Sequence, residues 1–541
     1  MAETAMRQLR NDTLGEDACV RTPFGERRVT YADHIASGRP LRSVEERLQR
    51  SVLPLYANTH TEDSATGAHT THLMHEATEY IKARLGADER YRLVFAGSGT
   101  TGAIKRMQEI LGLAVPSSLR DRVLAVLAPD ERPVVFVGPY EHHSNELSWR
   151  ESLAEVVTIP LDGRGTIDLD ALRRALEDAR FEGRPKIGSF SAASNVTGIV
   201  TDVRAVARLL HEHGAAAFFD FAASAPYVAI DVRPGQPDGI DALFLSPHKF
   251  LGGPGSPGLL LFDQMLYDQP APTTAGGGTV SYVSHGGHWF VEDIEAREDA
   301  GTPAILQKLR AAMAFEVKER IGVERIEERE RAFITEAIAR LRDHPNLQLL
   351  GNLEVPRLAV LSFEVRSGDR ILHPRFVTRL LNDLFGIQGR AGCSCAGPYG
   401  HDLLGIDAER SRAYHEAIEA GFEGVRPGWS RISFHYGISE EAFRFLLEAV
   451  TFVAEYGDRF VPLYRFDWRT GAWTHEADEA LPCGFDSASW PAVPRSEAPF
   501  VEDYRRYLEE ARRLAEGLQP PARPGSAPKG LDPSLVTFLT S

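Results

Sequence analysis

A lysine at the end of an apolar run is the first feature of this sequence that suggests chemistry. The run ALFLS ends at Ser246, His248 and Lys249 follow closely, and the next stretch is rich in glycine. Partial burial lowers the pKa of a lysine and frees its amine, which can then form a Schiff base with a carbonyl group. A surface salt bridge is the alternative for an isolated lysine. We therefore treat Lys249 as a candidate nucleophile.

Polar residues follow other apolar runs in the same way. Asp220 ends the run AAAFFD and could pair with a protonated pyridine nitrogen, the arrangement that turns such a ring into an electron sink. Asn195 follows KIGSFSAAS and could donate to a phenolic oxygen, while His142 in EHHSN could lie flat on an aromatic ring. A purely structural histidine is the alternative for His142.

A fourth run leads into a segment suited to a phosphate. FAG is followed by Ser98, Gly99, Thr100 and Thr101 and then by a helical pattern. Glycines permit close approach, and the N–H groups at a helix start attract anions. By itself the segment could be an ordinary strand-to-helix turn with a threonine cap. Together with Lys249 and Asp220, it indicates the phosphate cradle of pyridoxal phosphate.

The elements that must position these residues form an alternating pattern. Seven short β-rich runs between residues 91 and 262 alternate with amphipathic helical stretches. This pattern predicts a mostly parallel sheet covered by helices, in which ligands collect at the carboxyl ends of the strands. A single long charged helix is expected over residues 308–344, followed by a second α+β region.

We expect an α/β chain in four parts. An N-terminal extension, part of which packs on the small domain, precedes a large cofactor-binding domain with a seven-stranded sheet and a smaller α+β domain. The last part is a partly flexible extension with one expected helix, VEDYRRYLEEARRLAEGL, and no assigned function. The expected ranges are 1–55, 56–310, 311–465 and 466–541.

Composition excludes several classes of function. The chain has 541 residues, 43% of them hydrophobic, and a formal net charge of -16. Such a charge opposes binding to nucleic acid or to an anionic membrane. No stretch is long and apolar enough to span a membrane, and the first residues lack a signal core, so a cytoplasmic location is expected. Four cysteines in so long a chain are expected to be thiols: Cys19, Cys393, Cys395 and Cys483.

The order of these motifs resembles the class V aminotransferase and cysteine desulfurase family of fold-type I pyridoxal-phosphate enzymes. The resemblance covers residues 56–450 and is closest to the sulfur-assimilation-type desulfurases and selenocysteine lyases. Nine family motifs (GTT, EHH, SN..G, D.A, S.HK..G, GGG, AGTP, R.G..C and R.S) occur in the family's order. They fall at Gly99–Thr101, His142, Asn195, Asp220, Ser246/His248/Lys249, Gly276–Gly278, Gly301–Pro303, Arg390/Gly392/Cys395 and Arg431.

The resemblance implies roles for these residues and a homodimer. Lys249 holds the cofactor as a Schiff base, Asp220 pairs with the pyridinium nitrogen and His142 stacks on the ring. Arg431 binds the substrate carboxylate bidentately, which lysine could not do, and Arg390 and Asn195 complete the substrate site. The full set expected to bind the cofactor is Gly99, Thr100, Thr101, His142, Asn195, Asp220, Ser246, His248, Lys249 and, from the partner subunit, Thr302.

One position departs from the family pattern. Family members usually carry a glutamine three residues after the aspartate, where it donates to the phenolic oxygen of the cofactor, but this chain has Ala223. The loss leaves Asn195 alone on that oxygen. We expect the cofactor to be retained, while the reaction remains open.

The segment GIQGRAGCSCAGPYG bears on the reaction. Cys395 occupies the place of the desulfurase nucleophile, and Cys393 is an additional thiol. The favoured reaction is cysteine desulfuration, in which the thiolate of Cys395 attacks the substrate sulfur, leaving alanine and an enzyme persulfide for a possible sulfur-acceptor protein. Selenocysteine lyase is the related activity. The thiolate fraction of Cys395 depends on its local field.

Two alternatives stay open. Within enzymes, the chain could be a class V aminotransferase, lyase or epimerase acting on another amino acid, for which Ala223 is the main indication. In another class, it could be a non-catalytic binding module, although Lys249, Asp220 and Arg431 would then have no purpose. No carboxylate or thiol completes a metal site with His69, His72 and His75, so no metal is expected. His60 and Thr61 are expected at a substrate entrance or a dimer surface. The HGGH segment at His285–His288 is expected to form a glycine loop beside the active site.

Overall fold

The computed structural model describes residues 2–478, 493–521 and 527–540. The chain divides into two compact units. Unit 1 comprises Met1–His34, Asn195–Gly198 and Glu328–Ser541, and unit 2 comprises Ile35–Ser194 and Ile199–Glu327. The stretch expected as an N-terminal extension, residues 1–55, is therefore shared between the two units.

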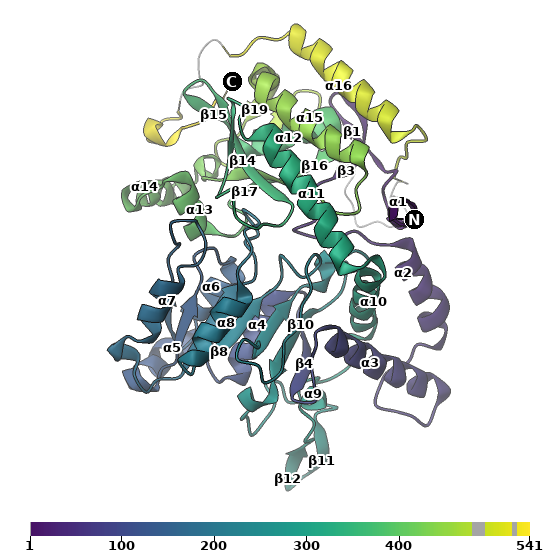
Figure 1. Cartoon of the computed structure of the whole chain (residues 1–541), viewed down its shortest axis with the longest axis vertical. Helices are drawn as coiled ribbons and strands as arrows, with labels where there is room; N and C mark the ends of the chain where they lie inside the picture. The colour runs from purple at the N-terminus through teal and green to yellow at the C-terminus, as the bar shows by residue number, and fades with distance from the viewer. Residues whose placement is uncertain (1, 479–492, 522–526, 541) are drawn as a thin grey trace. The chain divides into compact units, whose positions relative to one another are not determined.

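Unit 2 is built on the predicted seven-stranded sheet (Figure 1). Its strand order is β4-β10-β9-β8-β7-β5-β6. Only β10 is antiparallel to its neighbours, so the prediction of a mostly parallel α/β sheet is confirmed. The strands are β4 (Tyr91–Ala96), β5 (Val134–Val137), β6 (Glu155–Thr158), β7 (Lys186–Ser191), β8 (Ala216–Asp220), β9 (Ala242–Leu245) and β10 (Gly258–Asp263), one for each of the seven apolar runs.

Helices cover this sheet because most of its strands are apolar on both faces. Side chains such as Met107 and Trp149 pack against Val135, Phe218 and Phe244 in one core. The helices of unit 2 are α2 (Arg42–Arg47), α3 (Ala65–Arg84), α4 (Thr100–Ile110), α5 (Ser117–Leu124), α6 (His143–Arg150), α7 (Leu169–Leu176), α8 (Val203–Glu212), α9 (Ile294–Arg297) and α10 (Ile305–Ile321).

A two-stranded hairpin projects from unit 2 (Figure 1). It consists of β11 (Val280–Ser284) and β12 (Gly287–Phe290), and the HGGH segment spans its turn. The aromatic rings of Tyr282 and Trp289 are in contact across it and are exposed.

Unit 1 is an α+β unit around an antiparallel sheet. The sheet order is β13-β14-β18-β17, with β15 paired to β14. Its core is rich in aromatic side chains, including Phe376, Phe434 and Phe443. The strands are β13 (Leu347–Leu349), β14 (Val360–Ser367), β15 (Arg370–Leu372), β17 (Arg390–Gly392) and β18 (Trp429–Ser433), and the helices are α12 (Pro374–Phe385), α13 (Gly397–Leu404), α14 (Ala408–Glu419), α15 (Glu440–Tyr456) and most of α11 (Val323–Leu341).

The long charged helix expected over residues 308–344 is two helices, so that prediction was wrong. α10 ends at Ile321 and α11 begins at Val323. Gly322 lies between them with φ +91°, a left-handed value outside the helical region that glycine adopts without a steric penalty. Charged, helix-forming residues continue on both sides of Gly322, which is why the sequence pattern alone did not reveal the break.

Both ends of the chain belong to unit 1. The N-terminal part contains α1 (Ala2–Asp12) and the strands β1 (Cys19–Thr22), β2 (Gly25–Arg28) and β3 (Thr30–Tyr31). β1 and β2 form a hairpin, and β3 pairs in parallel with β16 (Ile387–Gln388).

The C-terminal part contains β19 (Tyr464–Phe466), β20 (Trp473–His475) and α16 (Phe500–Glu516). α16 corresponds to the helix expected there, and its Tyr504 stacks on Phe445 of α15 at 4.0 Å between ring centroids. Of the stretch PPARPGSAPKG, expected to be flexible, residues 522–526 lie outside the described residues, as does Cys483.

Candidate functional site

The strand ends of unit 2 bring the predicted aspartate and lysine onto neighbouring strands. Asp220 is the last residue of β8, in register with Ser191 of β7 and Phe244 of β9. β9 leads directly through Ser246 into the single 3₁₀ turn Pro247–Lys249. Burial raises the pKa of Asp220 to about 6, while a hydrogen bond from the backbone of Ala222 and the charge of Lys249 oppose that rise.

This setting tests whether the residues fit a pyridine nitrogen. The Asp220 carboxyl is buried and accepts a hydrogen bond from the Ala222 backbone N–H at 2.8 Å. A buried carboxylate is costly unless a cation accompanies it. A protonated pyridine nitrogen would supply that cation, so the position suits the cofactor that the sequence predicts.

The predicted phosphate cradle is assembled at the start of α4. The Thr100 N–H donates to Ser246 Oγ at 2.9 Å. A Cβ at Gly99 would come within 2.9 Å of the His248 ring and 3.0 Å of Ser246 Oγ, so only glycine fits between them. His248 Nδ1 is buried without a hydrogen-bond partner among the described residues. A helix start with a glycine approach and an unused buried nitrogen fits a phosphate group.

His142 belongs to the same strand-end region of unit 2. It caps α6, and its Nδ1 accepts from the Ser144 N–H at 3.1 Å, so the neutral ring carries its proton on Nε2. Ser144 Oγ in turn lies 2.7 Å from Thr101 Oγ1. A continuous polar chain therefore links the ring of His142 to the cradle.

Glu141 is a buried residue of this region that sequence reasoning missed. Its carboxylate accepts from the Gly138 and Ser191 N–H groups at 3.1 and 2.8 Å, from Ser191 Oγ at 2.6 Å and from Asn145 Nδ2 at 2.7 Å. Burial raises its pKa to about 7 against these hydrogen bonds. The glutamate ties the segment carrying His142 to β7. Its only signal in the sequence is a carboxylate immediately before the candidate histidine.

Unit 1 holds the arginine expected to bind a substrate carboxylate. Arg431 lies on β18, and burial lowers the pKa of its guanidinium. Its Nη1 donates to the Asn195 carbonyl at 2.8 Å and its Nη2 to Asp33 Oδ1 at 2.9 Å. Nε is buried without a hydrogen-bond partner among the described residues. The unused N–H leaves an edge of the guanidinium suited to a carboxylate.

Asp33 is a second residue that the sequence did not reveal. Its other oxygen accepts from Arg390 Nε at 2.9 Å, so one carboxylate joins both of the predicted substrate-binding arginines. Arg390 is about half exposed, whereas Arg431 is buried. Asp33 lies in a short polar stretch near the N-terminus, far in sequence from both arginines, and no local pattern marks it.

Cys395 lies in a tight turn that follows β17. Ser394 and Cys395 have φ values of +51° and +57°, and the Ala396 N–H donates to the Cys393 carbonyl at 3.1 Å. Asn195 Nδ2 fixes the turn by donating to the Ser394 carbonyl at 2.7 Å. Left-handed backbone at non-glycine residues is strained and occurs preferentially at functional sites.

The thiol of Cys395 is exposed, and a thiolate there acts electrostatically on the guanidinium of Arg431. Cys393 is only partly buried. Cys19 is buried, and burial together with Glu26 raises its pKa to about 11, so it is an inert thiol.

The two units therefore divide the predicted residues. Unit 2 holds the candidates for binding the cofactor except Asn195, and unit 1 holds Asn195, Arg431, Arg390 and Cys395. Asn195, expected at the phenolic oxygen, makes its contacts to Ser394 and Arg431 within unit 1. Thr302 is exposed on unit 2, and Ala223 is buried there with no side-chain donor.

Comparison with known proteins identifies the family. The model of the class-V aminotransferases matches residues 30–441, which is more than half of the chain. The chain therefore belongs to the class-V aminotransferase family, whose members are pyridoxal-phosphate enzymes, and the resemblance inferred from the motifs is confirmed.

Proteins named as cysteine desulfurases or probable cysteine desulfurases are among the relatives that it matches. A cysteine desulfurase of Synechococcus elongatus is 29% identical over 69% of this chain, and the match spans 55% of that protein's own length. A probable cysteine desulfurase of Halalkalibacterium halodurans is 27% identical over 76% of this chain and 94% of its own.

Solved structures agree on the fold. A cysteine desulfurase from Thermococcus onnurineus NA1 has a TM-score of 0.65 at 24% identity, covering 83% of this chain and 98% of that one. The Escherichia coli cysteine desulfurase CsdA has a TM-score of 0.63 at 23% identity with the same coverage. No helix within the described residues is long and apolar enough to cross a membrane.

Proposed function

We propose that this protein is a pyridoxal-phosphate-dependent cysteine desulfurase that converts L-cysteine to L-alanine and carries the sulfur as a persulfide on Cys395. The observation that carries the proposal is the turn at Cys395. Asn195 holds this turn by donating to the Ser394 carbonyl, the thiol of Cys395 is exposed, and the same unit holds the buried Arg431. Selenocysteine, whose selenium occupies the place of the sulfur, is the related substrate.

Unit 2 supplies the cofactor-binding groups. Bound pyridoxal phosphate supplies an electron sink for the α-carbon of the substrate. Lys249 would hold the cofactor through its amine, and this amine would also accept the α-proton of the substrate. Asp220 keeps the pyridine nitrogen protonated. Gly99, Thr100, Thr101, Ser246 and His248 bind the phosphate.

His142 has two tasks in this proposal. Its ring stacks on the cofactor, and its Nε2 moves a proton near the reacting atoms. The hydrogen bond from the Ser144 N–H to Nδ1 fixes the ring and its tautomer for both tasks. Glu141 holds the backbone that carries the ring.

Unit 1 supplies the substrate-binding and sulfur-accepting groups. The free edge of Arg431 binds the substrate carboxylate, and Arg390 adds a second cation. The thiolate of Cys395 attacks the substrate sulfur, so that a sulfur–sulfur bond forms as the carbon–sulfur bond breaks.

We also propose a homodimer with a protein as sulfur acceptor. Leu53, Leu55 and Tyr56 form an exposed apolar stretch in unit 2, and the β11–β12 hairpin exposes Tyr282 and Trp289. Apolar groups gathered on a surface mark contacts with another chain. Thr302 reaches the phosphate of the partner subunit in this proposal, since it is exposed on its own unit.

A second candidate function is favoured by Ala223. Ala223 has a methyl group at the position where members of the family usually carry a glutamine, whose side chain is a hydrogen-bond donor. A changed hydrogen-bond environment of the cofactor would redirect the chemistry toward transamination, lyase or epimerase activity on another amino acid.

Product analysis tests the proposal. Purified protein loaded with pyridoxal phosphate is incubated with L-cysteine and a thiol reductant, and alanine, sulfide, pyruvate and ammonia are quantified. Equal amounts of alanine and sulfide are expected from the wild type, and neither from Cys395→Ala. Cys393→Ala removes a thiol two residues away and is expected to retain activity. Pyruvate and ammonia, or no turnover with cofactor bound, would favour the second candidate.

A further inference from the structure

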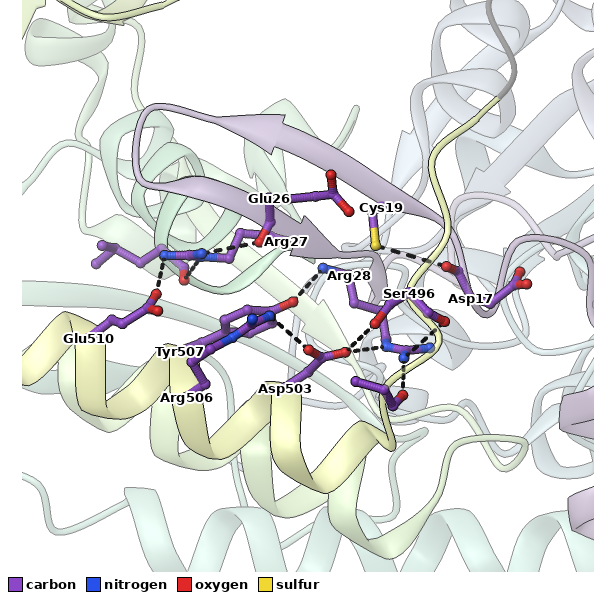
Figure 2. Close-up of polar contacts among 12 residues, drawn as sticks. Asp17, Cys19, Glu26, Arg27, Arg28, Ser496, Asp503, Arg506, Tyr507 and Glu510 are labelled. Atoms are coloured by element: carbon purple, nitrogen blue, oxygen red, sulfur yellow. Dashed lines mark hydrogen bonds and ion pairs between the residues drawn. The ribbon is translucent and has the colours of Figure 1, made fainter.

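The C-terminal extension packs on the N-terminal hairpin of unit 1 (Figure 2). The Tyr507 hydroxyl of α16 accepts from the Arg28 N–H at 2.9 Å, and the guanidinium of Arg27 lies over the Tyr507 ring. The Cys19 N–H donates to the Pro494 carbonyl at 2.8 Å. The family match ends at residue 441, so this contact involves a part of the chain beyond it.

A buried ion pair anchors the contact. Arg28 Nε lies 3.0 Å from Asp503 Oδ2, and the two side chains are only 3% and 2% exposed. Ser496 Oγ and Arg506 also donate to Asp503, each at 2.8 Å, as Figure 2 shows. Removing Asp503 would leave the buried cation of Arg28 without this counter-charge, so the ion pair favours the docked position of α16.

The anchored hairpin leads directly to Asp33. β3 follows the hairpin and pairs with β16, and the Thr30 hydroxyl lies 3.4 Å from the Tyr504 hydroxyl of α16. The Ala32 carbonyl then accepts from the N–H of Ser433 at 2.8 Å and from its Oγ at 3.0 Å. The His34 N–H donates to the same Oγ at 3.0 Å, so the backbone on both sides of Asp33 is bonded to β18.

Asp33 of this segment contacts both of the predicted substrate-binding arginines. It holds Arg431 through Oδ1 and Arg390 through Oδ2. Arg431 keeps its Nε unused, and Asp33 together with the Asn195 carbonyl determines the direction in which that edge faces. An arginine can bind a carboxylate through two parallel hydrogen bonds only when the plane of its guanidinium is held in one orientation.

We propose that the C-terminal extension is part of the substrate-binding apparatus: α16 fixes the N-terminal segment, and Asp33 at its end is the positioning residue that sets Arg431 for the substrate carboxylate. The proposal rests on the proposed function, because it takes Arg431 as the group that binds the carboxylate. It gives the extension a role in catalysis without contact to the reacting atoms.

Charge and position have opposite effects at Asp33, which makes the proposal testable. Loss of its negative charge alone would increase the positive potential and tighten the binding of a carboxylate. Loss of its positioning would weaken binding. Weaker carboxylate binding in Asp33→Asn would therefore show that Asp33 positions Arg431. Asp33→Glu keeps the charge but moves it, so it should weaken carboxylate binding as well.

The experiment measures the dissociation constant of L-alanine from the absorbance change of the bound cofactor, using full-length loaded protein. Ethylamine, which lacks the carboxylate, is titrated in parallel. Asp33→Asn is expected to raise the constant for L-alanine about tenfold and to leave that for ethylamine unchanged. Asp503→Asn, which removes the charge of the buried ion pair with Arg28, is expected to raise the dissociation constant for L-alanine a few-fold. Glu509→Gln, an exposed loss of the same charge on α16, is the matched control and is expected to bind as the wild type does.

Distinct results separate the two proposals. A wild-type spectrum that does not respond to L-alanine would overturn the proposed function and this inference with it. A wild type that responds, with Asp33→Asn equal or tighter for L-alanine, would overturn the positioning role of Asp33 alone. If Asp503→Asn binds as the wild type does while Asp33→Asn is weakened, the role of the extension is refuted. Equal weakening for ethylamine would indicate general damage and would contradict the proposal.

Discussion

Replacing Asp220 by asparagine is expected to stabilise the cofactor-free protein and to weaken cofactor binding. Burial raises the pKa of Asp220 from its usual 3.8 to about 6. Because the folded protein holds this proton more tightly than the unfolded chain, folding stability falls as the pH rises from about 4 to 6. A difference of about two units corresponds to a cost of about 3 kcal/mol above pH 6. Asparagine keeps the acceptor for the Ala222 N–H and has no charge to bury.

The assay compares urea unfolding of cofactor-free wild type and Asp220→Asn between pH 4 and 8, followed by titration with pyridoxal phosphate. Near pH 4 the two proteins should have equal stability. At pH 7 to 8 the variant should be more stable by up to about 3 kcal/mol. Its affinity for the cofactor should be lower by roughly 10- to 100-fold, since the charge-assisted hydrogen bond to the pyridinium is lost.

Two results would refute this reasoning. If the difference in stability did not change with pH, burial of an ionised Asp220 would not be the cost that the structure indicates. If the variant bound the cofactor as tightly as the wild type, Asp220 would not be the partner of the pyridine nitrogen.

Two further predictions concern unit 1. Burial raises the pKa of Glu330 to about 8. The free energy of unfolding of the wild type, measured with urea, should therefore fall by about 5 kcal/mol relative to that of Glu330→Gln as the pH rises from 4.5 to 8. Unfolding free energies that change with pH in the same way in both proteins would contradict this prediction. Arg431→Lys should raise KM for L-cysteine by roughly tenfold or more and change kcat less, because an ammonium group cannot bind the carboxylate through two parallel hydrogen bonds. An unchanged KM in steady-state kinetics would show that Arg431 does not bind the substrate carboxylate.

The sheet of unit 2 could be predicted because its information is local. Each strand is a short apolar run; Asp220 ends one of them, and Lys249 lies in the turn that follows another. Parallel strands place their carboxyl ends at one edge, so the candidates for binding the cofactor could be grouped without knowledge of the packing. The cradle at Gly99 and Thr100 followed from the same rule.

The remaining features depend on contacts between distant segments. Asp33 and Arg431 are 398 positions apart in sequence and meet only in the folded unit 1, where β3 pairs with β16. The docking of α16 depends on the Arg28–Asp503 pair, whose members are separated by 475 positions. Glu141 could have been suspected from its place before His142, but its four donors come together only in the folded sheet.

Borohydride reduction of the loaded protein tests the central claim most directly. The reduction makes the link between the cofactor and its lysine permanent, and peptide mass spectrometry then locates the pyridoxyl group. We expect the group on Lys249 in the wild type and on no lysine of Lys249→Ala. A protein that carries the group on another lysine, or on none after saturation with pyridoxal phosphate, would contradict the account.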